Sequence, residues 1–133
     1  MSPRISGIDH LVLTVADIAA TLTFYRDVLG MQPETFTPPD GSTRWALAFG
    51  SQKINLHQAG AEFDPKAAHV RPGSADLCFL SDTPLALWQD HLRQAGVPVE
   101  LGPLRRTGAT GPLLSLYIRD PDGNLVEISN LLA

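Results

Sequence analysis

The chain has 133 residues and a net charge of −4 at neutral pH, a size that fits one compact domain. Hydrophobic residues make up 44% and charged residues 18%, so a disordered chain is not expected. Charged residues or His interrupt every apolar stretch before it reaches the roughly 18 residues that a membrane helix needs. The slight acidity, with no basic cluster beyond Arg105 and Arg106, argues against nucleic acid and favours a small-molecule partner.

The first half of the sequence predicts one strand, one helix and three further strands. β-Branched residues and leucine fill residues 8–15, which is typical of a strand. Asp17 resembles a helix N-cap, and apolar residues then fall at helical spacing up to Gly30, which is suited to end a helix. The strands expected after this helix are a weak one near 32–37 and two clear ones at 45–49 and 53–57.

The second half predicts the same order of elements. We expect a strand at 75–80, a helix at 85–95, a weak strand near 97–101, a strand at 114–119, a turn at 120–124 and a strand at 125–129. Two irregular stretches interrupt the pattern: a connector at 60–72 and a loop at 102–112 that is rich in glycine and proline. Loops of this length often have a functional role.

Matching residues lie 66 positions apart in the two halves, which indicates an internal duplication. The matching pairs are Gly7 and Gly73, Leu11 and Leu77, Leu22 and Trp88, and Gly30 and Gly96. The sequence therefore predicts a single α+β domain over residues 1–133. It would contain two βαβββ modules, at about 5–60 and 70–133.

Polar residues stand at matching places on the first and last strands of each half. Because side chains alternate along a strand, His10 is expected to point away from the helix, and Asp76 holds the same slot in the second half. The last strand carries Glu127 among apolar residues, and its counterpart places Asn55 and His57 on one face. A buried carboxylate is costly unless a cation or donor compensates it, so we expect His10, His57, Glu127 and Asp76 to bind a metal ion.

The cysteine content limits the possible metal ligands, and the first residues bear on the cellular compartment. Cys78 is the only cysteine, which excludes an internal disulfide and a cysteine-rich zinc module. A metal ion would therefore depend on His and carboxylate ligands. The first residues lack the apolar stretch of a signal peptide, so we expect a cytoplasmic protein.

Four further residues are candidates for contact with a substrate. Tyr117 and Arg119 alternate with apolar residues on the strand before the closing turn, so both could face a cleft. Arg106 lies in the predicted glycine-rich loop and could meet an anionic group, and Trp45 could line the cleft as an aromatic wall.

These features resemble the vicinal oxygen chelate superfamily, which includes glyoxalase I, extradiol dioxygenases, methylmalonyl-CoA epimerases and fosfomycin and bleomycin resistance proteins. The segments that carry the resemblance are IDHLVLTVADIAATLTFYRDVLGM, KINLHQ, GSADLCFL and RDPDGNLVEISN. Within the superfamily, the chain looks closest to the branch of glyoxalase domain-containing protein 5 and virulence-associated proteins. The resemblance implies that the two modules form an incomplete β-barrel around one metal ion.

The resemblance also assigns ligands residue by residue. His10 matches the family's first-strand His, and Glu127 matches its last-strand Glu. The closing ligand of the first module falls in KINLHQ, where His57 is the better ligand chemically and Asn55 is the alternative by register. Asp76 stands where the family usually has a second His, which is a departure from the pattern. The cofactor implied is a divalent ion such as Zn, Mn, Ni or Fe.

Two functions are consistent with this resemblance. The first is a metal-dependent enzyme that chelates a small oxygen-bearing substrate, by glyoxalase-like lyase or isomerase chemistry or by extradiol dioxygenase chemistry, with Glu127 as a catalytic residue. The alternative is a protein of the bleomycin-resistance type that binds a small molecule without turning it over. Either would be expected to form a homodimer, because an incomplete barrel exposes sheet edges.

Overall fold

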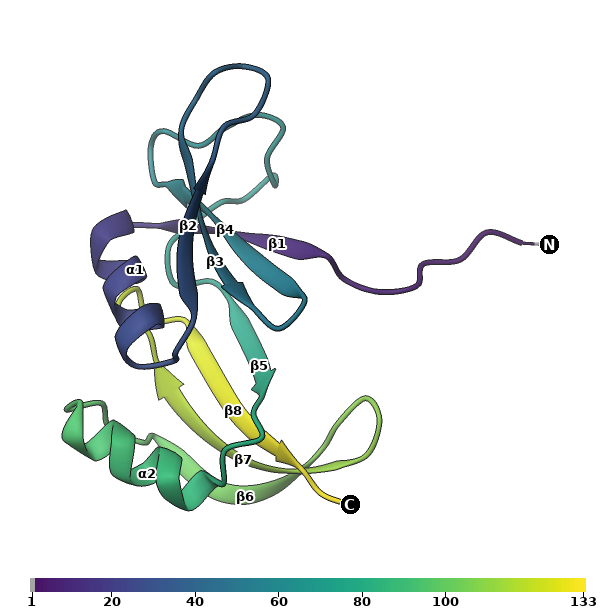
Figure 1. Ribbon diagram of the computed structural model, residues 1–133, viewed down its shortest axis with the longest axis vertical. Helices are drawn as coiled ribbons and strands as arrows, with labels where there is room; N and C mark the ends of the chain where they lie inside the picture. The colour runs from purple at the N-terminus through teal and green to yellow at the C-terminus, as the bar shows by residue number, and fades with distance from the viewer. Residues whose placement is uncertain (1) are drawn as a thin grey trace. The chain divides into compact units, whose positions relative to one another are not determined.

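Two four-stranded sheets, each accompanied by one helix, make up the computed structural model, which describes residues 2–133 (Figure 1). The chain divides into two units, Met1–Arg71 and Pro72–Ala133, and each is described by itself. Each unit runs strand, helix and three strands, and neither described sheet closes into a barrel. The predicted α+β class with two βαβββ modules is therefore confirmed. No helix within residues 2–133 is long and apolar enough to span a membrane.

The strand order of the first unit is β1-β4-β3-β2, with β1 parallel to β4 and the other pairs antiparallel. Its elements are β1 (His10–Val15), α1 (Ile18–Asp27), β2 (Gln32–Phe36), β3 (Arg44–Phe49) and β4 (Gln52–Gln58). Asp17 caps α1 as predicted, because its carboxylate accepts the Ala20 N–H at 3.1 Å. Gly30 follows the helix with φ of 74°, a left-handed conformation that turns the chain towards β2.

Helix α1 covers one face of the first sheet. Its Tyr25 is fully buried, and so are Val15 on β1 and Ile54 on β4. Burying such side chains stabilises the fold by about 1.5–3 kcal/mol each. The other face of this sheet meets the connector after β4, since the ring of Phe63 lies edge-on to that of His57 with centroids 5.3 Å apart. The connector is irregular, as predicted, and it closes part of the polar face.

The second unit repeats the strand order as β5-β8-β7-β6, with β5 parallel to β8. Its elements are β5 (Asp76–Leu80), α2 (Leu85–Gln94), β6 (Leu101–Thr107), β7 (Pro112–Arg119) and β8 (Leu125–Leu131). Helix α2 contacts β7 and β8, and its Leu92 is fully buried together with Leu116 and Ile128. Gly96 follows α2 with φ of 73°, which matches Gly30 after α1.

The β7–β8 turn of the second unit is built around a buried amide. Asn124 is 1% exposed, and its Oδ1 accepts the Ala75 N–H at 2.8 Å while its Nδ2 donates to Asp120 Oδ2 at 2.8 Å. Asp120 Oδ1 accepts two further backbone N–H groups, from Asp122 and Asn124. The turn is thereby tied to the residue before β5, which fixes where β5 begins beside β8.

Strand β6 corrects the prediction for residues 97–112. We expected a strand near 97–101 and a loop at 102–112, whereas the strand spans Leu101–Thr107 and only residues 108–111 connect it to β7. Gly102 and Pro103 hid this strand, because both residues are rare inside strands. They are tolerated here because β6 is an edge strand and its register shifts between Leu101 and Leu104, which is an irregularity of the β-bulge kind.

Candidate functional site

Polar side chains gather on the face of the first sheet that α1 does not cover. In the parallel pairing of β1 with β4, Val12 lies opposite Asn55 and Thr14 lies opposite His57. Because alternate residues share a face, His10 lies on the same side as these four residues. We call this set, His10, Val12, Thr14, Asn55 and His57, the first donor face. The predicted direction of His10 agrees with the register.

His10 is held in a way that suits a metal ligand. Its Nδ1 lies 2.8 Å from Asp9 Oδ2, and its side chain is 43% exposed. A proton on Nδ1 that is donated to this carboxylate leaves the lone pair on Nε2 available. Metal-binding histidines commonly make such a bond through their second ring nitrogen. His10 is therefore arranged to offer Nε2 to a cation or a proton donor.

Asn55 carries a buried oxygen with unmet hydrogen-bonding capacity. Its Oδ1 is inaccessible to solvent and accepts no hydrogen bond from any residue in the range 2–133. Leaving a buried acceptor unpaired costs about 1–3 kcal/mol, so such atoms usually have a partner. An amide oxygen is a competent ligand for a hard cation. Asn55 thus marks a place on the first donor face where a cation or a ligand donor fits.

His57 lies deeper on the same face, with 7% of its surface exposed. Burial, followed by the nearby Arg44 guanidinium, lowers the pKa of His57 below its ordinary value of 6.5. The Arg44 guanidinium stacks 3.8 Å from the centroid of the Phe63 ring, which itself packs on His57. His57 is therefore neutral at pH 7, the form in which imidazole accepts a proton or binds a metal.

A cavity of about 390 Å³ opens beside His57 within the first unit. Val12, Thr14 and His57 supply one wall, and the connector supplies Pro65, Lys66 and Val70. Its volume lies within the range of about 300–1,000 Å³ that is common for small-molecule sites. The connector therefore forms part of the wall of this cavity over the first donor face.

The second sheet carries a corresponding polar face on the side away from α2. Glu127 on β8 lies between Cys78 on β5 and Tyr117 on β7, and Asp76 shares the face two residues before Cys78. We call the set Asp76, Cys78, Arg106, Tyr117 and Glu127 the second donor face. Four expected site residues, Asp76, Arg106, Tyr117 and Glu127, are thus brought onto one surface.

A small network of hydroxyls orients Glu127. Ser129 Oγ donates to Glu127 Oε2 at 3.3 Å, and the Oγ atoms of Ser129 and Ser115 are 2.7 Å apart. Both serines are fully buried. The Cys78 thiol lies 3.3 Å from Ser129 Oγ, and burial raises the pKa of that thiol. Cys78 therefore remains a protonated thiol beside Glu127.

A second cavity, of about 430 Å³, lies over this face within the second unit. Its lining includes Glu127, Cys78 and Leu113, together with Arg106 and residues 107–110 of the β6–β7 hairpin. The guanidinium Nε of Arg106 donates to the Tyr117 hydroxyl at 2.8 Å. Two of the expected substrate contacts therefore meet each other beside a cavity that contains Glu127.

Two expected substrate contacts are placed differently. Trp45 pairs with Leu56 across β3 and β4, so its side chain lies on the opposite side of the sheet from Asn55 and His57. Side chains alternate along β3, and Ala46 pairs with Asn55. Trp45 is the residue before Ala46, so its side chain lies on the other face. Arg119 shares the face of Tyr117 and Glu127, but its guanidinium binds both carboxylate oxygens of Glu100 at 3.0 Å.

The strand registers identify which residue of the first unit corresponds to Glu127. Glu127 lies opposite Cys78, two residues after Asp76, and Asn55 lies opposite Val12, two residues after His10. His57 corresponds in the same way to Ser129, since each pairs with the residue four after His10 or Asp76. The sequence left Asn55 and His57 open as alternatives, and the register makes Asn55 the counterpart of Glu127.

The two donor faces offer nitrogen and oxygen donors to a metal ion. Across residues 2–133, no group of three or more His, Cys, Asp or Glu side chains is placed to hold a metal ion. Asn55 adds an amide oxygen that is buried and unpaired. Imidazole nitrogen and amide oxygen on the first donor face, and carboxylate oxygen on the second, are each suitable ligands for a divalent ion. By donor type, the residues of each face therefore suit such an ion.

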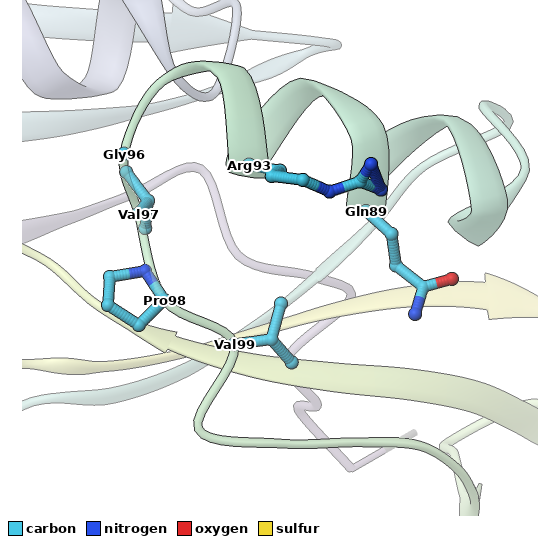
Figure 2. Close-up of a pocket in the computed structure, with 6 residues that line it drawn as sticks. All are labelled: Gln89, Arg93, Gly96, Val97, Pro98 and Val99. Carbon is cyan, nitrogen blue, oxygen red and sulfur yellow. The ribbon is translucent and has the colours of Figure 1, made fainter.

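A third cavity, of about 410 Å³, lies at the end of α2 in the second unit (Figure 2). Gln89 and Arg93 project from the helix, and the segment 96–99 forms the other wall. Arg93 is paired with Asp90 at 2.6 Å. None of the predicted site residues lines this cavity, and α2 covers the opposite side of the sheet from Glu127.

Two βαβββ units with polar donors on their first and last strands define a protein of the vicinal oxygen chelate class. The chain belongs to the Glyoxalase/Bleomycin resistance protein/Dioxygenase superfamily, whose family model matches residues 7–128.

Three relatives show where the chain lies within this superfamily. It is 56% identical to the virulence protein STM3117 of Salmonella typhimurium, over 94% of this chain and 84% of that protein. It is 52% identical to the glyoxalase domain-containing protein RDO1 of Mycosarcoma maydis, over 95% and 69% of the two chains. A solved structure from the mobile metagenome of V. Pseudocholerae, VPC_CASS1, superposes with a TM-score of 0.94 at 53% identity and covers 100% of both chains. The names of the first two confirm the predicted branch.

More distant relatives have names that state activities. The metallothiol transferase FosB of Bacillus licheniformis is 28% identical over 94% of this chain and 75% of that protein. A lactoylglutathione lyase from Agrobacterium tumefaciens has a TM-score of 0.68 at 28% identity, over 96% of this chain and 95% of that structure. The superfamily to which this chain belongs thus includes relatives named as transferase and lyase.

Proposed function

We propose that this protein is a metal-dependent enzyme that binds a small substrate through two neighbouring oxygens. The observation that carries the proposal is the buried, unpaired Oδ1 of Asn55 on the first donor face. It stands at the position that corresponds to Glu127, a carboxylate oriented by Ser129. A buried acceptor and an oriented carboxylate at matching positions are the expected arrangement for cation ligands.

The proposed ligands are His10, Asn55, Asp76 and Glu127, with His57 as the alternative to Asn55. Their donor atoms suit Zn²⁺, Mn²⁺, Ni²⁺ or Fe²⁺. When bound, the ion would act as a Lewis acid that stabilises negative charge on substrate oxygens, as both glyoxalase-like and extradiol dioxygenase-like reactions require.

The remaining residues of the second donor face would bind and orient the substrate. Tyr117 fixes the Arg106 guanidinium, which is suited to hold an anionic group. Glu127 is proposed as the catalytic carboxylate that moves a proton, since Ser129 holds one of its oxygens in place. We also propose that the enzyme works as a cytoplasmic homodimer.

The proposal is tested by metal content after purification without added metal. The wild type and the His69→Ala variant should retain a bound divalent ion, while the His10→Ala and Glu127→Ala variants should lose it. His69 serves as the matched control, because it is an exposed His of the connector outside the proposed ligand set. If the wild type binds no divalent ion more tightly than His10→Ala and Glu127→Ala, the proposal is wrong.

The reaction type is tested with two substrates on the metal-loaded protein. Turnover of the methylglyoxal–thiol adduct would indicate isomerase or lyase chemistry, and oxygen consumption with catechol would indicate dioxygenase chemistry. In either case Glu127→Gln should lower the rate at least about 100-fold, as loss of a general acid–base residue does. A Glu127→Gln variant with the wild-type rate would remove Glu127 from the catalytic role.

A second candidate is a protein that binds a small molecule without turnover. It is favoured by the largely apolar wall that Val12, Pro65 and Val70 form in the first cavity. Equal binding of a small-molecule ligand with and without divalent ions, together with no turnover, would support this candidate over the enzyme.

A further inference from the structure

The cavity over the second donor face is lined by groups of different chemistry. Glu127, whose orientation is set by Ser129, is one of its lining residues. Arg106 is another, and no ion pair joins Arg106 to a carboxylate within residues 2–133. Leu80 and Leu113 add apolar lining. The cavity therefore suits a ligand with an anionic group, a short apolar body and a second polar group.

Arg106 is held in place by contacts with Tyr117. Its Nε donates to the Tyr117 hydroxyl at 2.8 Å, and its guanidinium carbon lies 5.5 Å from the centroid of the Tyr117 ring. Tyr117 is in turn the cross-strand neighbour of Glu127. The bond to Tyr117 uses one N–H, so the guanidinium keeps its other N–H donors for a ligand. A guanidinium with a fixed position binds a planar carboxylate with less loss of entropy than a mobile one.

The hairpin beside Arg106 is closed by backbone pairing. The Gly108 N–H donates to the Gly111 carbonyl at 2.9 Å, and Thr107 pairs with Pro112 across the strands. A Cβ on Gly108 would lie 2.7 Å from the Gly111 oxygen and 2.9 Å from Leu113, so glycine is needed there. Thr107 and Thr110 both line the cavity, as Arg106 does. The hairpin therefore presents the Arg106 guanidinium, a group suited to an anion, on the cavity lining.

The two adjacent arginines differ in their placement. Arg106 pairs with Leu113, which lies on the face of Glu127, whereas Arg105 pairs with Leu114 on the other face. The sequence shows only two consecutive arginines, and the register separates their roles. Arg105 therefore carries the same charge as Arg106 but does not line the cavity, so it serves as an internal control.

We propose that Arg106 binds the carboxylate of a small acidic substrate and so determines substrate class. The acid would place its carboxylate at Arg106 and its reacting oxygens at Glu127. The inference rests on the proposed function only because it assumes that the substrate reacts at Glu127. The carboxylate contact itself needs no metal ion.

The test measures binding to the full chain after treatment with EDTA, so that no metal ion contributes. Calorimetry compares 3-phenylpropionate with 3-phenylpropionamide, a neutral probe of nearly the same shape. The acid should bind the wild type at least about 10-fold more tightly than the amide, which is the size of one charge-assisted contact. Arg106→Gln should reduce this ratio to about 1, and Arg106→Lys should keep part of it because it retains the charge.

Arg105→Gln is the matched control, since it removes the same charge from the neighbouring residue. It should keep the wild-type ratio. The inference is overturned if the wild type does not prefer the acid, if neither probe binds, or if Arg105→Gln lowers the ratio as much as Arg106→Gln. A preserved acid preference in a protein that fails the metal test would refute the metal-dependent enzyme while leaving this inference standing.

Discussion

The two modules share one order of elements, but each is stabilised internally by a different kind of polar contact. In the first, Asp17 caps α1 from the adjacent position in the sequence. In the second, α2 begins after Pro84, and Asn130 on β8 supplies the cap by accepting the Leu85 N–H at 2.9 Å. The same Asn130 donates to the carbonyl oxygens of Ser81 and Thr83. One module thus stabilises its helix locally, and the other does so through tertiary structure.

The two donor faces also differ in the chemical groups that they carry. The first is partly closed by the connector and contains the neutral imidazole of buried His57 beside the unpaired Asn55. The second is partly closed by the β6–β7 hairpin and contains the carboxylate of Glu127 and the guanidinium of Arg106. The modules therefore keep the same backbone frame while each face carries its own chemistry.

Asn124→Ala should produce the largest loss of stability. It leaves the Ala75 N–H and the Asp120 carboxylate without their partners in a buried turn, so the free energy of unfolding should fall by about 2–4 kcal/mol. Urea denaturation measures this change. Ser51→Ala, in the exposed β3–β4 turn of the first module, should change stability by less than about 0.5 kcal/mol. An equal loss of stability in Asn124→Ala and Ser51→Ala would contradict the difference between the two modules.

Asn55→Ala and His57→Ala distinguish the two candidate ligands of the first module. Because Asn55 corresponds in register to Glu127, Asn55→Ala should weaken Zn²⁺ binding at least about 10-fold, and His57→Ala should weaken it less. Competition with a chelating dye measures both affinities, and circular dichroism verifies that each variant folds. The reverse order would identify His57 as the ligand, in spite of the register.

Asn130→Ala should destabilise the protein more than Asp17→Ala. Asn130 makes three hydrogen bonds to backbone groups around the start of α2, and their loss should cost about 2 kcal/mol. Asp17 makes one capping bond, worth about 1 kcal/mol. Thermal and urea unfolding of both variants give the comparison. A larger loss for Asp17→Ala would show that local capping dominates in both helices.

The pH dependence of stability should reflect His57. Its pKa in the folded protein lies below the ordinary value of 6.5, so the unfolded chain takes up a proton first as the pH falls. The free energy of unfolding should therefore decrease below about pH 6.5, by at most about 1.4 kcal/mol per pH unit for one proton. His57→Gln should remove this part of the slope between pH 7 and pH 5. An unchanged slope in the variant would assign the pH dependence to other groups.

The sequence predicted most elements because their signals are local. Glycine after each helix, the Asp17 cap and the alternation of apolar residues all lie within a few positions of the structure that they determine. Strand β6 was missed for the same reason. Its residues Gly102 and Pro103 disfavour a strand locally, and only pairing with β7 at the sheet edge makes one.

The candidate site was predicted in part. The residue types at His10, Asp76, Glu127 and Tyr117, with strand alternation, were enough to place each on a polar face. Trp45 was misplaced because the alternation of β3 can be related to β4 only when their register is known. Arg119 was identified as a face residue, but its pairing with Glu100 joins residues 19 positions apart and has no local signal.

By itself the sequence determined the duplicated βαβββ order, the α+β class and the polar character of the first and last strands, since these depend on periodicity and on residue type. Tertiary structure decided that Asn55 corresponds to Glu127, that Arg106 and not Arg105 meets the second cavity, and that Asn130 caps α2. The physical reason is that strand register reverses the face of every side chain with a shift of one residue. Register is set by contacts between segments far apart in the chain.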